Sequence, residues 1–277
     1  MSESMPTEVR RERMLGVLVE QEFARVAELA EVFGVSTVTV RADLDALEEQ
    51  GKVRRVRGGA VAAGPPPKGE PSFELSLGAA AVEKALIARA AARLVGSGES
   101  VLMGAGTTTA YVARELVARP ELTEVTVFTN GLRTALELEP ALPRFAVVVT
   151  GGSLRRQQHS LVDPLGGRML EGIRAHTVFL GCGGVHPEAG VTNVNLPDAE
   201  MKQRMLRAAA RRIVVADSSK LGRIEMAPVC GLPEVDLLIT GESADPETVR
   251  LLRERGLRVE IAARQRAGGG ARVSRPA

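Results

Sequence analysis

Two short stretches of the sequence combine residue types that suit the binding of an anion. The stretch from Gly104 to Thr109 holds two glycines, which let a backbone approach a ligand closely, and three threonines, which supply hydroxyl groups. The stretch from Asp217 to Lys220 offers an ammonium for a phosphate or a carboxylate, and an acid that can orient this lysine or bind sugar hydroxyls. Ordinary strand-to-helix turns contain the same residue types, so each stretch alone leaves a purely structural role open.

Both stretches directly follow short apolar runs, and so do three further groups of small or polar residues. These groups are Thr129–Gly131, Thr150–Gly152 and Gly181–Gly184. In an open sheet of parallel strands, ligands bind beyond the carboxyl ends of the strands, and a helix N-terminus after Gly106 favours an anion such as phosphate. The set therefore predicts a site for a small, polar, anionic ligand.

The elements that must position this site alternate along the chain. Apolar runs lie at 100–103, 124–128, 145–149, 176–180, 212–216, 235–239 and 257–261. Helix-like stretches lie at 79–95, 108–118, 131–138, 165–174, 198–211 and 246–255. Continuous β-branched runs separated by helices indicate a parallel sheet that is covered on both faces. The sequence therefore predicts a doubly wound α/β domain.

A pair of helices is predicted near the N-terminus, because apolar residues recur there at helical spacing. They are Val26, Leu29, Ala30 and Phe33 in the first helix, and Val40, Leu44 and Leu47 in the second. Gly34 can end the first helix, Ser36 can cap the second, and Gly51 ends it. A helix, a short turn with glycine and a capped helix form the helix-turn-helix pattern.

The second helix of such a pair enters the major groove of DNA by its N-terminal residues. Here these residues are Ser36, Thr37, Val38, Thr39 and Arg41. After Gly51, four cations in six positions precede a Gly-Gly turn, which predicts a two-stranded wing whose arginines contact phosphates. Residues 1–60 hold nine Lys/Arg against eleven Asp/Glu, so the positive surface is a small focus. A three-helix bundle with a solvated basic hairpin is the alternative.

The stretch 25–60, RVAELAEVFGVSTVTVRADLDALEEQGKVRRVRGGA, resembles the N-terminal winged helix of DeoR-type regulators. The resemblance implies that Ser36, Thr37, Thr39 and Arg41 face double-stranded DNA. It implies that Arg54, Arg55 and Arg57 serve the wing. The sequence departs from the family pattern at Ala42, where a second arginine is usual; this departure bears on DNA affinity or on the bases that are read.

The rest of the chain is similar to the DeoR C-terminal sensor domain, whose fold resembles ribose-5-phosphate isomerase and glucosamine-6-phosphate deaminase. The matching stretches are GTTT, Thr-Asn-Gly, Thr-Gly-Gly, AEMKQRML and ADSSKLGR. The resemblance implies that a phosphorylated sugar contacts Thr107, Thr108, Asn130, Gly151, Gly152, Lys202 and Lys220. Gly106 and Asp217 join this candidate effector site from the residue types alone. Gly104 stands where the family commonly has Asp, which puts the usual effector class in doubt.

Four segments are expected. Residues 1–63 form the winged helix-turn-helix, and residues 64–72, GPPPKGEPS, form a linker because four prolines and two glycines exclude helix and central strand. Residues 73–263 form the α/β effector domain. The tail 264–277 has no apolar period and is expected to be disordered.

Composition excludes several classes of protein. Two distant cysteines and three histidines show no zinc-type spacing and no disulfide framework, so no metal and no cofactor are predicted. The charged N-terminus lacks the apolar region of a signal peptide, and no run of 18 apolar residues occurs, so a cytoplasmic protein without a membrane partner is expected.

Three functions are compared. The first is a transcriptional regulator, a repressor of carbohydrate genes that is released by a phosphorylated sugar and acts as a homo-oligomer, dimer or tetramer. The second is a sugar-phosphate isomerase or deaminase with an accessory helix-turn-helix, in which Glu200 or Asp217 is the base and Lys220 its electrostatic partner. The third is a regulator that senses another ligand. The helix-turn-helix favours a regulator, without catalytic residues.

Overall fold

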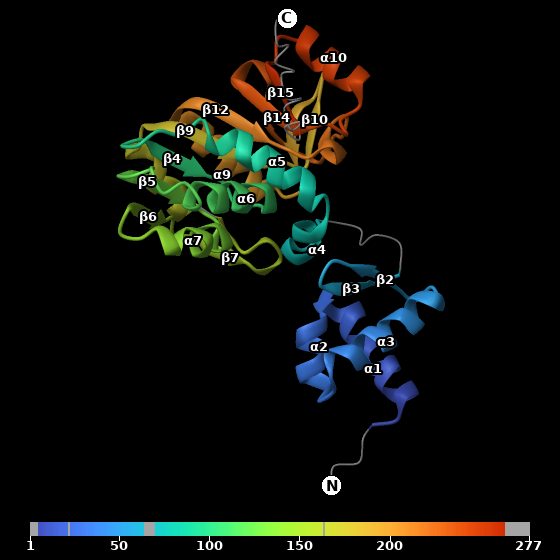
Figure 1. Ribbon diagram of the computed structural model, residues 1–277. Helices are drawn as coiled ribbons and strands as arrows, with labels where there is room; N and C mark the ends of the chain where they lie inside the picture. Colours follow the sequence, from blue (N-terminus) through green and yellow to red (C-terminus); the bar gives the residue numbers. More distant parts are fainter. Residues whose placement is uncertain (1–4, 22, 64–69, 163, 264–277) are drawn as a thin grey trace, which may run out of the picture.

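The computed structural model describes residues 5–21, 23–63, 70–162 and 164–263. The predicted tail and residues 64–69 of the predicted linker lie outside the described residues. A smaller N-terminal part, here called the head, and a larger part, here called the body, are visible in Figure 1.

The head contains three helices and a three-stranded antiparallel sheet. Its elements are α1 (Thr7–Gln21), β1 (Phe23–Arg25), α2 (Val26–Phe33), α3 (Thr37–Glu49), β2 (Val53–Val56) and β3 (Gly59–Ala62). The sheet order is β1-β3-β2, so the predicted two-stranded wing gains a third strand from the segment before α2. Met14 and Leu18 of α1 pack in one core with Leu29 of α2 and Leu44 of α3.

The turn between α2 and α3 has the predicted chemistry. Gly34 ends α2 with φ 61°, a left-handed conformation that glycine adopts without a steric penalty. The Ser36 side chain accepts a hydrogen bond from the Thr39 N–H at 3.1 Å and so caps α3. The helix-turn-helix is therefore built from local signals that are present in the sequence.

The body is organised around a seven-stranded parallel sheet of order β15-β14-β12-β9-β4-β5-β6. Its strands are β4 (Ser100–Met103), β5 (Val125–Thr129), β6 (Phe145–Val149), β9 (Ala175–Leu180), β12 (Ala209–Val215), β14 (Leu237–Gly241) and β15 (Val259–Ala262). Every predicted apolar run supplies one of these strands. The doubly wound α/β prediction is thus confirmed.

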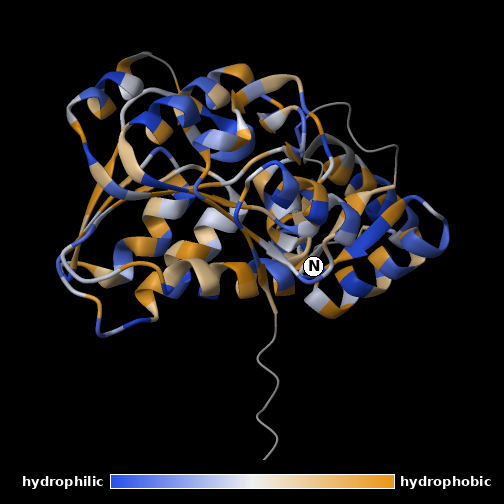
Figure 2. Cartoon of the chain, turned by 90° about the horizontal axis from the view of Figure 1, so that it is seen from above, coloured by the Kyte–Doolittle hydropathy of each residue, from blue (hydrophilic) through white to orange (hydrophobic). Residues whose placement is uncertain are grey.

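Helices cover both faces of this sheet. On one face lie α5 (Ala81–Ala92), α6 (Thr107–Val117) and α7 (Leu132–Leu138), and on the other lie α9 (Leu196–Arg207) and α10 (Pro246–Glu254). Two separate clusters of buried apolar residues fill the spaces above and below the strands. Figure 2 shows hydrophobic colours on the strands between the helices. Among the described residues, no helix has the length and apolar character needed to cross a bilayer.

Several elements differ from the predicted ranges. The predicted helix 198–211 ends at Arg207, because Ala209 pairs with Ala175 and begins β12. The stretch 165–174 forms the short α8 (Pro164–Arg168) and the 3-10 helix η3 (Met169–Gly172). Besides α1 and β1 of the head, elements without a sequence prediction are α4 (Phe73–Gly78), η1 (Glu139–Ala141), β7 (Ser153–Arg155), η2 (Arg156–Gln158), β8 (Ser160–Val162), β10 (Gly184–His186), β11 (Gly190–Asn193), η4 (Ser218–Lys220), β13 (Ala227–Cys230) and η5 (Leu232–Glu234).

Candidate functional site

The N-terminal half of α3 presents an exposed face. Thr37, Val38, Arg41 and Ala42 are exposed there, whereas Val40 and Leu44 on the opposite side of the helix are buried in the head. Ser36 and Thr39 are partly occupied with each other, because their hydroxyl oxygens lie 2.9 Å apart in the cap. Thr37 and Arg41 are therefore the predicted residues whose side chains are most available to a DNA base.

Val38 also lies on this face, although the resemblance to DeoR-type regulators assigns it no contact with DNA. Val38 is 70% exposed. Apolar side chains on a recognition helix can contact the methyl group of thymine. Val38 does not belong to the apolar series Val40, Leu44 and Leu47, so the sequence already places it on the other side of the helix.

A buried ion-pair cluster holds α3 against α1. The carboxylate of Asp43, 2% exposed, accepts hydrogen bonds from the Arg10 Nε at 2.6 Å and the Arg11 Nε at 2.8 Å. Burial raises the pKa of Asp43, but the hydrogen bonds and charges of the two arginines outweigh burial, and the pKa lies below its ordinary value. The orientation of the recognition helix thus depends on a buried charge.

The three wing arginines have different surroundings. Arg54 and Arg57 are exposed on β2 and in the turn that follows it. Arg55 is half-buried, forms an ion pair with Asp45 of α3, and donates to the Arg41 carbonyl at 3.3 Å. The role of Arg54 and Arg57 as phosphate ligands stays a prediction, and both also line the cavity of the body, whereas Arg55 fixes the wing to α3.

A cavity of about 1390 Å³ lies at the carboxyl ends of β4, β9 and β12 and extends to the wing. Six of the sequence-predicted effector residues line this cavity. They are Gly106, Thr107, Thr108, Lys202, Asp217 and Lys220. The whole lining of the cavity holds five Lys or Arg against three Asp or Glu, so the charge there favours an anion.

The cavity contains the N-terminus of α6. Gly106 precedes the helix with φ 152°, a conformation that favours glycine, and Thr107 and Thr108 form its first turn. The first N–H groups of a helix have no partner within the helix and carry a partial positive charge. Thr109 does not contribute its hydroxyl to the cavity, because that hydroxyl donates to the Gly104 carbonyl at 2.6 Å.

A second wall of the cavity is a buried polar triad on β11 and α9. Lys202 Nζ lies 2.8 Å from Asp198 Oδ2 and donates to Asn193 Oδ1 at 3.2 Å, and Asn193 Nδ2 donates to Asp198 Oδ2 at 2.7 Å. All three residues are at most 4% exposed. Asp198 Oδ1 has no hydrogen-bond partner among the described residues, and it is a buried acceptor in a residue that lines the cavity. Asp198 and Asn193 were not predicted as site residues.

The third wall is the loop after β12. Asp217 Oδ1 accepts a hydrogen bond from the Ser219 N–H at 3.2 Å. The Glu83 carboxylate accepts hydrogen bonds from the Ser218 N–H at 2.9 Å and from the Ser218 hydroxyl at 3.0 Å. The half-buried Lys220 has no ion-pair or hydrogen-bond partner for its ammonium within the part of the chain that the structure describes. An unpaired cation at a cavity is available to an anionic ligand.

Three predicted effector residues do not line the cavity. Asn130 is 1% exposed, and its amide is used by the Ala105 N–H at 2.7 Å and the Leu161 carbonyl at 3.0 Å. Gly152 packs against backbone, since a Cβ there would lie 2.3 Å from the Val162 carbonyl oxygen, whereas a Cβ on Gly151 would meet no atom within 4 Å; neither glycine lines the cavity. These three residues lie in loops next to the cavity and do not form part of its wall.

Gly104, which stands where an aspartate is expected from the family resemblance, has no room for a side chain. A Cβ at this position would lie 2.7 Å from Leu180 Cδ2, so the neighbouring strand fills the space of the missing side chain. An acid at position 104 would have to displace Leu180. Carboxylates that line the cavity, such as Asp198 and Asp217, are candidate acceptors for hydroxyl groups.

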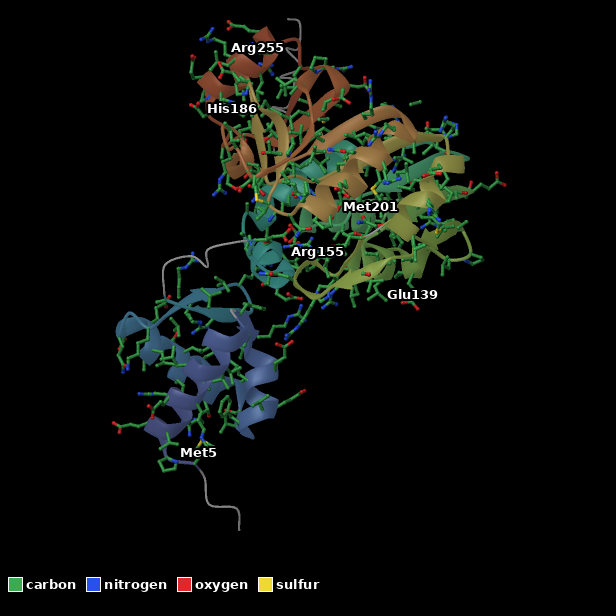
Figure 3. All side chains as sticks on the ribbon, turned by 180° about the vertical axis from the view of Figure 1, so that it is seen from behind. Met5, Glu139, Arg155, His186, Met201 and Arg255 are labelled. Atoms are coloured by element: carbon green, nitrogen blue, oxygen red, sulfur yellow. The ribbon has the colours of Figure 1, made fainter. Side chains whose placement is uncertain are left out.

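Of the three residues weighed for catalysis, Asp217 and Lys220 line the cavity. Glu200 is exposed and does not line the cavity. Burial raises the pKa of the Cys182 thiol to about 11, although Lys202 and Lys220 lower it, so this thiol is neutral near pH 7. Figure 3 shows His186 at the end of the body farthest from the head.

Family models match both parts of the chain. A model described as the DeoR-like helix-turn-helix domain matches residues 10–65, and one described as the DeoR C-terminal sensor domain matches residues 79–242. The chain belongs to the DeoR family. It is a DeoR-type DNA-binding transcriptional regulator with a C-terminal sensor domain.

Relatives of this DeoR-type chain match along nearly their whole length. The uncharacterized HTH-type transcriptional regulator YulB of Bacillus subtilis is 34% identical over 250 residues, covering 90% of this chain and 95% of YulB. GlpR of Haloferax volcanii is 33% identical over 259 residues, covering 92% and 97%. GolR of Listeria innocua is 31% identical over 253 residues, covering 91% and 98%. These proteins are named as regulators, and the chain is a regulator rather than an enzyme.

Solved structures resemble the body of the DeoR-type chain more distantly. Ribose 5-phosphate isomerase A of Methanocaldococcus jannaschii is 20% identical, with a TM-score of 0.38, and the match covers 51% of this chain and 55% of the isomerase.

Proposed function

We propose that this DeoR-type regulator represses genes of carbohydrate metabolism and leaves its operator when a phosphorylated sugar enters the cavity of the body. The division of labour follows the predicted segments: residues 1–63 bind double-stranded DNA, and residues 73–263 bind the effector. Binding to two half-sites requires a homo-oligomer, a dimer or a tetramer. The cytoplasmic location expected from the sequence stays a prediction.

The observation that carries the proposal is the pairing of anion donors with an unsatisfied acceptor in one cavity. The first turn of α6 and the ammonium of Lys220 offer donors to a phosphate. Across the cavity, the buried Asp198 Oδ1 has no partner in the described part of the chain and can accept a hydrogen bond from a hydroxyl group. A phosphorylated sugar supplies both groups in one small molecule.

Calorimetric titration tests the effector class. We expect ribose 5-phosphate or glucosamine 6-phosphate to bind the full chain, and free ribose and glucosamine to bind far more weakly. Lys220→Ala should weaken the binding of the phosphorylated ligand by about 10- to 100-fold, because one hydrogen bond to a charged group is lost. Arg250→Ala removes an exposed cation of the body and serves as the control. Equal affinity for sugars with and without phosphate would reject this effector class.

The DNA side of the proposal predicts the effect of Arg41→Ala. This variant should lose about 1–3 kcal/mol of binding free energy on a specific site, because an exposed arginine at the start of α3 can donate two hydrogen bonds to guanine. Fluorescence anisotropy on specific and random duplexes at fixed salt measures the loss. Arg13→Ala, which removes an exposed arginine of α1, is the matched control. An equal loss on both duplexes would mean that Arg41 contacts phosphate and does not read a base.

A further inference from the structure

The turn between α4 and α5, near the start of the body, contains a strained residue. Ala80 precedes α5 with φ 50° and ψ 33°, a left-handed conformation that a residue with a Cβ rarely adopts. Such a conformation persists when neighbouring contacts hold it in place. The contacts at this turn therefore decide how firmly α4 is held on the body.

Lys84 supplies these contacts. Its side chain is almost fully buried, and its ammonium donates hydrogen bonds to the carbonyl of Ala79 at 2.6 Å and to the carbonyl of Ser76. Ser76 lies in α4 and Ala79 in the turn, while Lys84 belongs to α5. One ammonium thus ties the end of α4 and the strained turn to α5.

The same ammonium faces the effector cavity. Lys84 lines that cavity together with Asp217, and its Nζ lies 3.8 Å from Asp217 Oδ2, which is an ion pair but too long for a hydrogen bond. An ammonium has three N–H donors, and two of them are used on carbonyl groups. The third N–H makes no hydrogen bond within normal distance to the residues that the structure describes, and Lys84 lines the cavity. Burial lowers the pKa of Lys84, and the nearby Asp217 offsets part of this effect.

The segment before the turn is also held by the β7–β8 region. Glu74 Oε1 lies 2.8 Å from His159 Nε2, and Phe73, 3% exposed, packs edge-on against the His159 ring. Just before them, Glu70 forms an ion pair with Arg155. Figure 1 shows α4 at the end of the body nearest to the head, and Figure 3 shows Arg155 on the same side. This segment is the first described part of the body, after residues 64–69.

We propose that Lys84 is a positioning residue that couples the effector cavity to the docking of α4. An anion bound beside Lys84 accepts its third N–H and stabilises the buried ammonium, which strengthens its charge-assisted hydrogen bonds to Ser76 and Ala79. Anion binding and α4 docking then stabilise each other, as linkage requires. This coupling takes one assumption from the proposed function, which is that the effector carries an anionic group.

Hydrogen exchange of the full chain tests the first half of this proposal without any ligand. In Lys84→Met the amides of residues 73–80 should exchange about fivefold or more faster than in the unmodified protein, while those of α10 should not change. Arg89→Met is the control, because Arg89 lies on the same helix, is 62% exposed and pairs with Glu115. Unchanged exchange of residues 73–80 in Lys84→Met would overturn the proposal.

Inorganic phosphate at millimolar concentration tests the second half, because it carries the anionic group without a sugar. It should slow the exchange of residues 73–80 by about fivefold or more in the unmodified protein and in Arg89→Met. Lys84→Gln keeps N–H donors for the carbonyls but carries no charge, so its exchange should not respond to phosphate. A response of equal size in Lys84→Gln, or no response in the unmodified protein, would overturn the coupling. The calorimetric comparison of sugars with and without phosphate tests the proposed function separately.

Discussion

Asp43→Ala is expected to lower the free energy of unfolding of the head by about 3–5 kcal/mol. The variant removes the buried acceptor of two arginines and leaves Arg10, 8% exposed, as an uncompensated cation between α1 and α3. A small domain has only a few kcal/mol of stability, so much of the head should be unfolded and specific DNA binding should be lost. Urea unfolding followed by circular dichroism measures the change.

Asp45→Ala is the matched control for this substitution. Asp45 lies on the same helix, is 59% exposed, and pairs with Arg55 at the surface, so its removal should cost about 1 kcal/mol or less. A cost for Asp43→Ala no larger than that of Asp45→Ala would show that the buried cluster does not stabilise the head.

The same cluster predicts how the stability of the head depends on pH. The pKa of Asp43 is lowered in the folded head from its ordinary value of 3.8, so the folded state favours the ionised carboxylate. The stabilisation is complete above the pKa of the unfolded state, about pH 5 and higher, and is lost as the pH falls through the lower pKa of the folded state. The difference in stability between the unmodified protein and Asp43→Ala should therefore shrink on acidification.

Lys202→Met is the second substitution with a large expected effect. It leaves the carboxylate of Asp198 buried without its cation, and we expect the free energy of unfolding of the body to fall by about 3–5 kcal/mol. It also removes a positive charge from the cavity, so the binding of a sugar phosphate should be lost in the fraction that stays folded. Denaturant unfolding and calorimetric titration of the same preparation separate these two effects.

The double variant Asp198→Asn with Lys202→Met distinguishes a loss of stability from a loss of recognition. It removes both charges, so no buried charge is left unpaired, and stability should recover in large part. Ligand binding should stay weak, because both the cation and the charged acceptor are gone. Recovery of both stability and ligand binding would show that the triad contributes only to folding.

Much of the fold follows from local patterns in the sequence. Gly34 and Ser36 define the turn of the helix-turn-helix by their own backbone and capping preferences. The apolar runs predict the parallel strands because both faces of each strand are buried. Residues that follow these runs directly, such as Gly106 and Lys220, line the cavity because the topology brings the carboxyl ends of the strands to one edge.

Other features depend on contacts between distant segments. Lys84 lies in an alanine-rich helix and has no polar pattern around it, yet the fold places it beside Asp217, 133 positions later in the sequence. Asn130 follows a strand as the predicted ligands do, but the 160–162 strand returns to it and uses its amide. The strand that begins at Ala209 is set by pairing with Ala175, which overrides a local preference for helix.

The most direct measurement is fluorescence anisotropy of the full chain on DNA from upstream of its own gene and the neighbouring genes. The titration is run at fixed salt, with and without ribose 5-phosphate, glucosamine 6-phosphate and the matching free sugars. We expect specific binding that at least one phosphorylated sugar weakens and that the free sugars leave unchanged. Specific binding that ignores every phosphorylated sugar but is weakened by a free sugar would contradict the proposed release by a phosphorylated sugar.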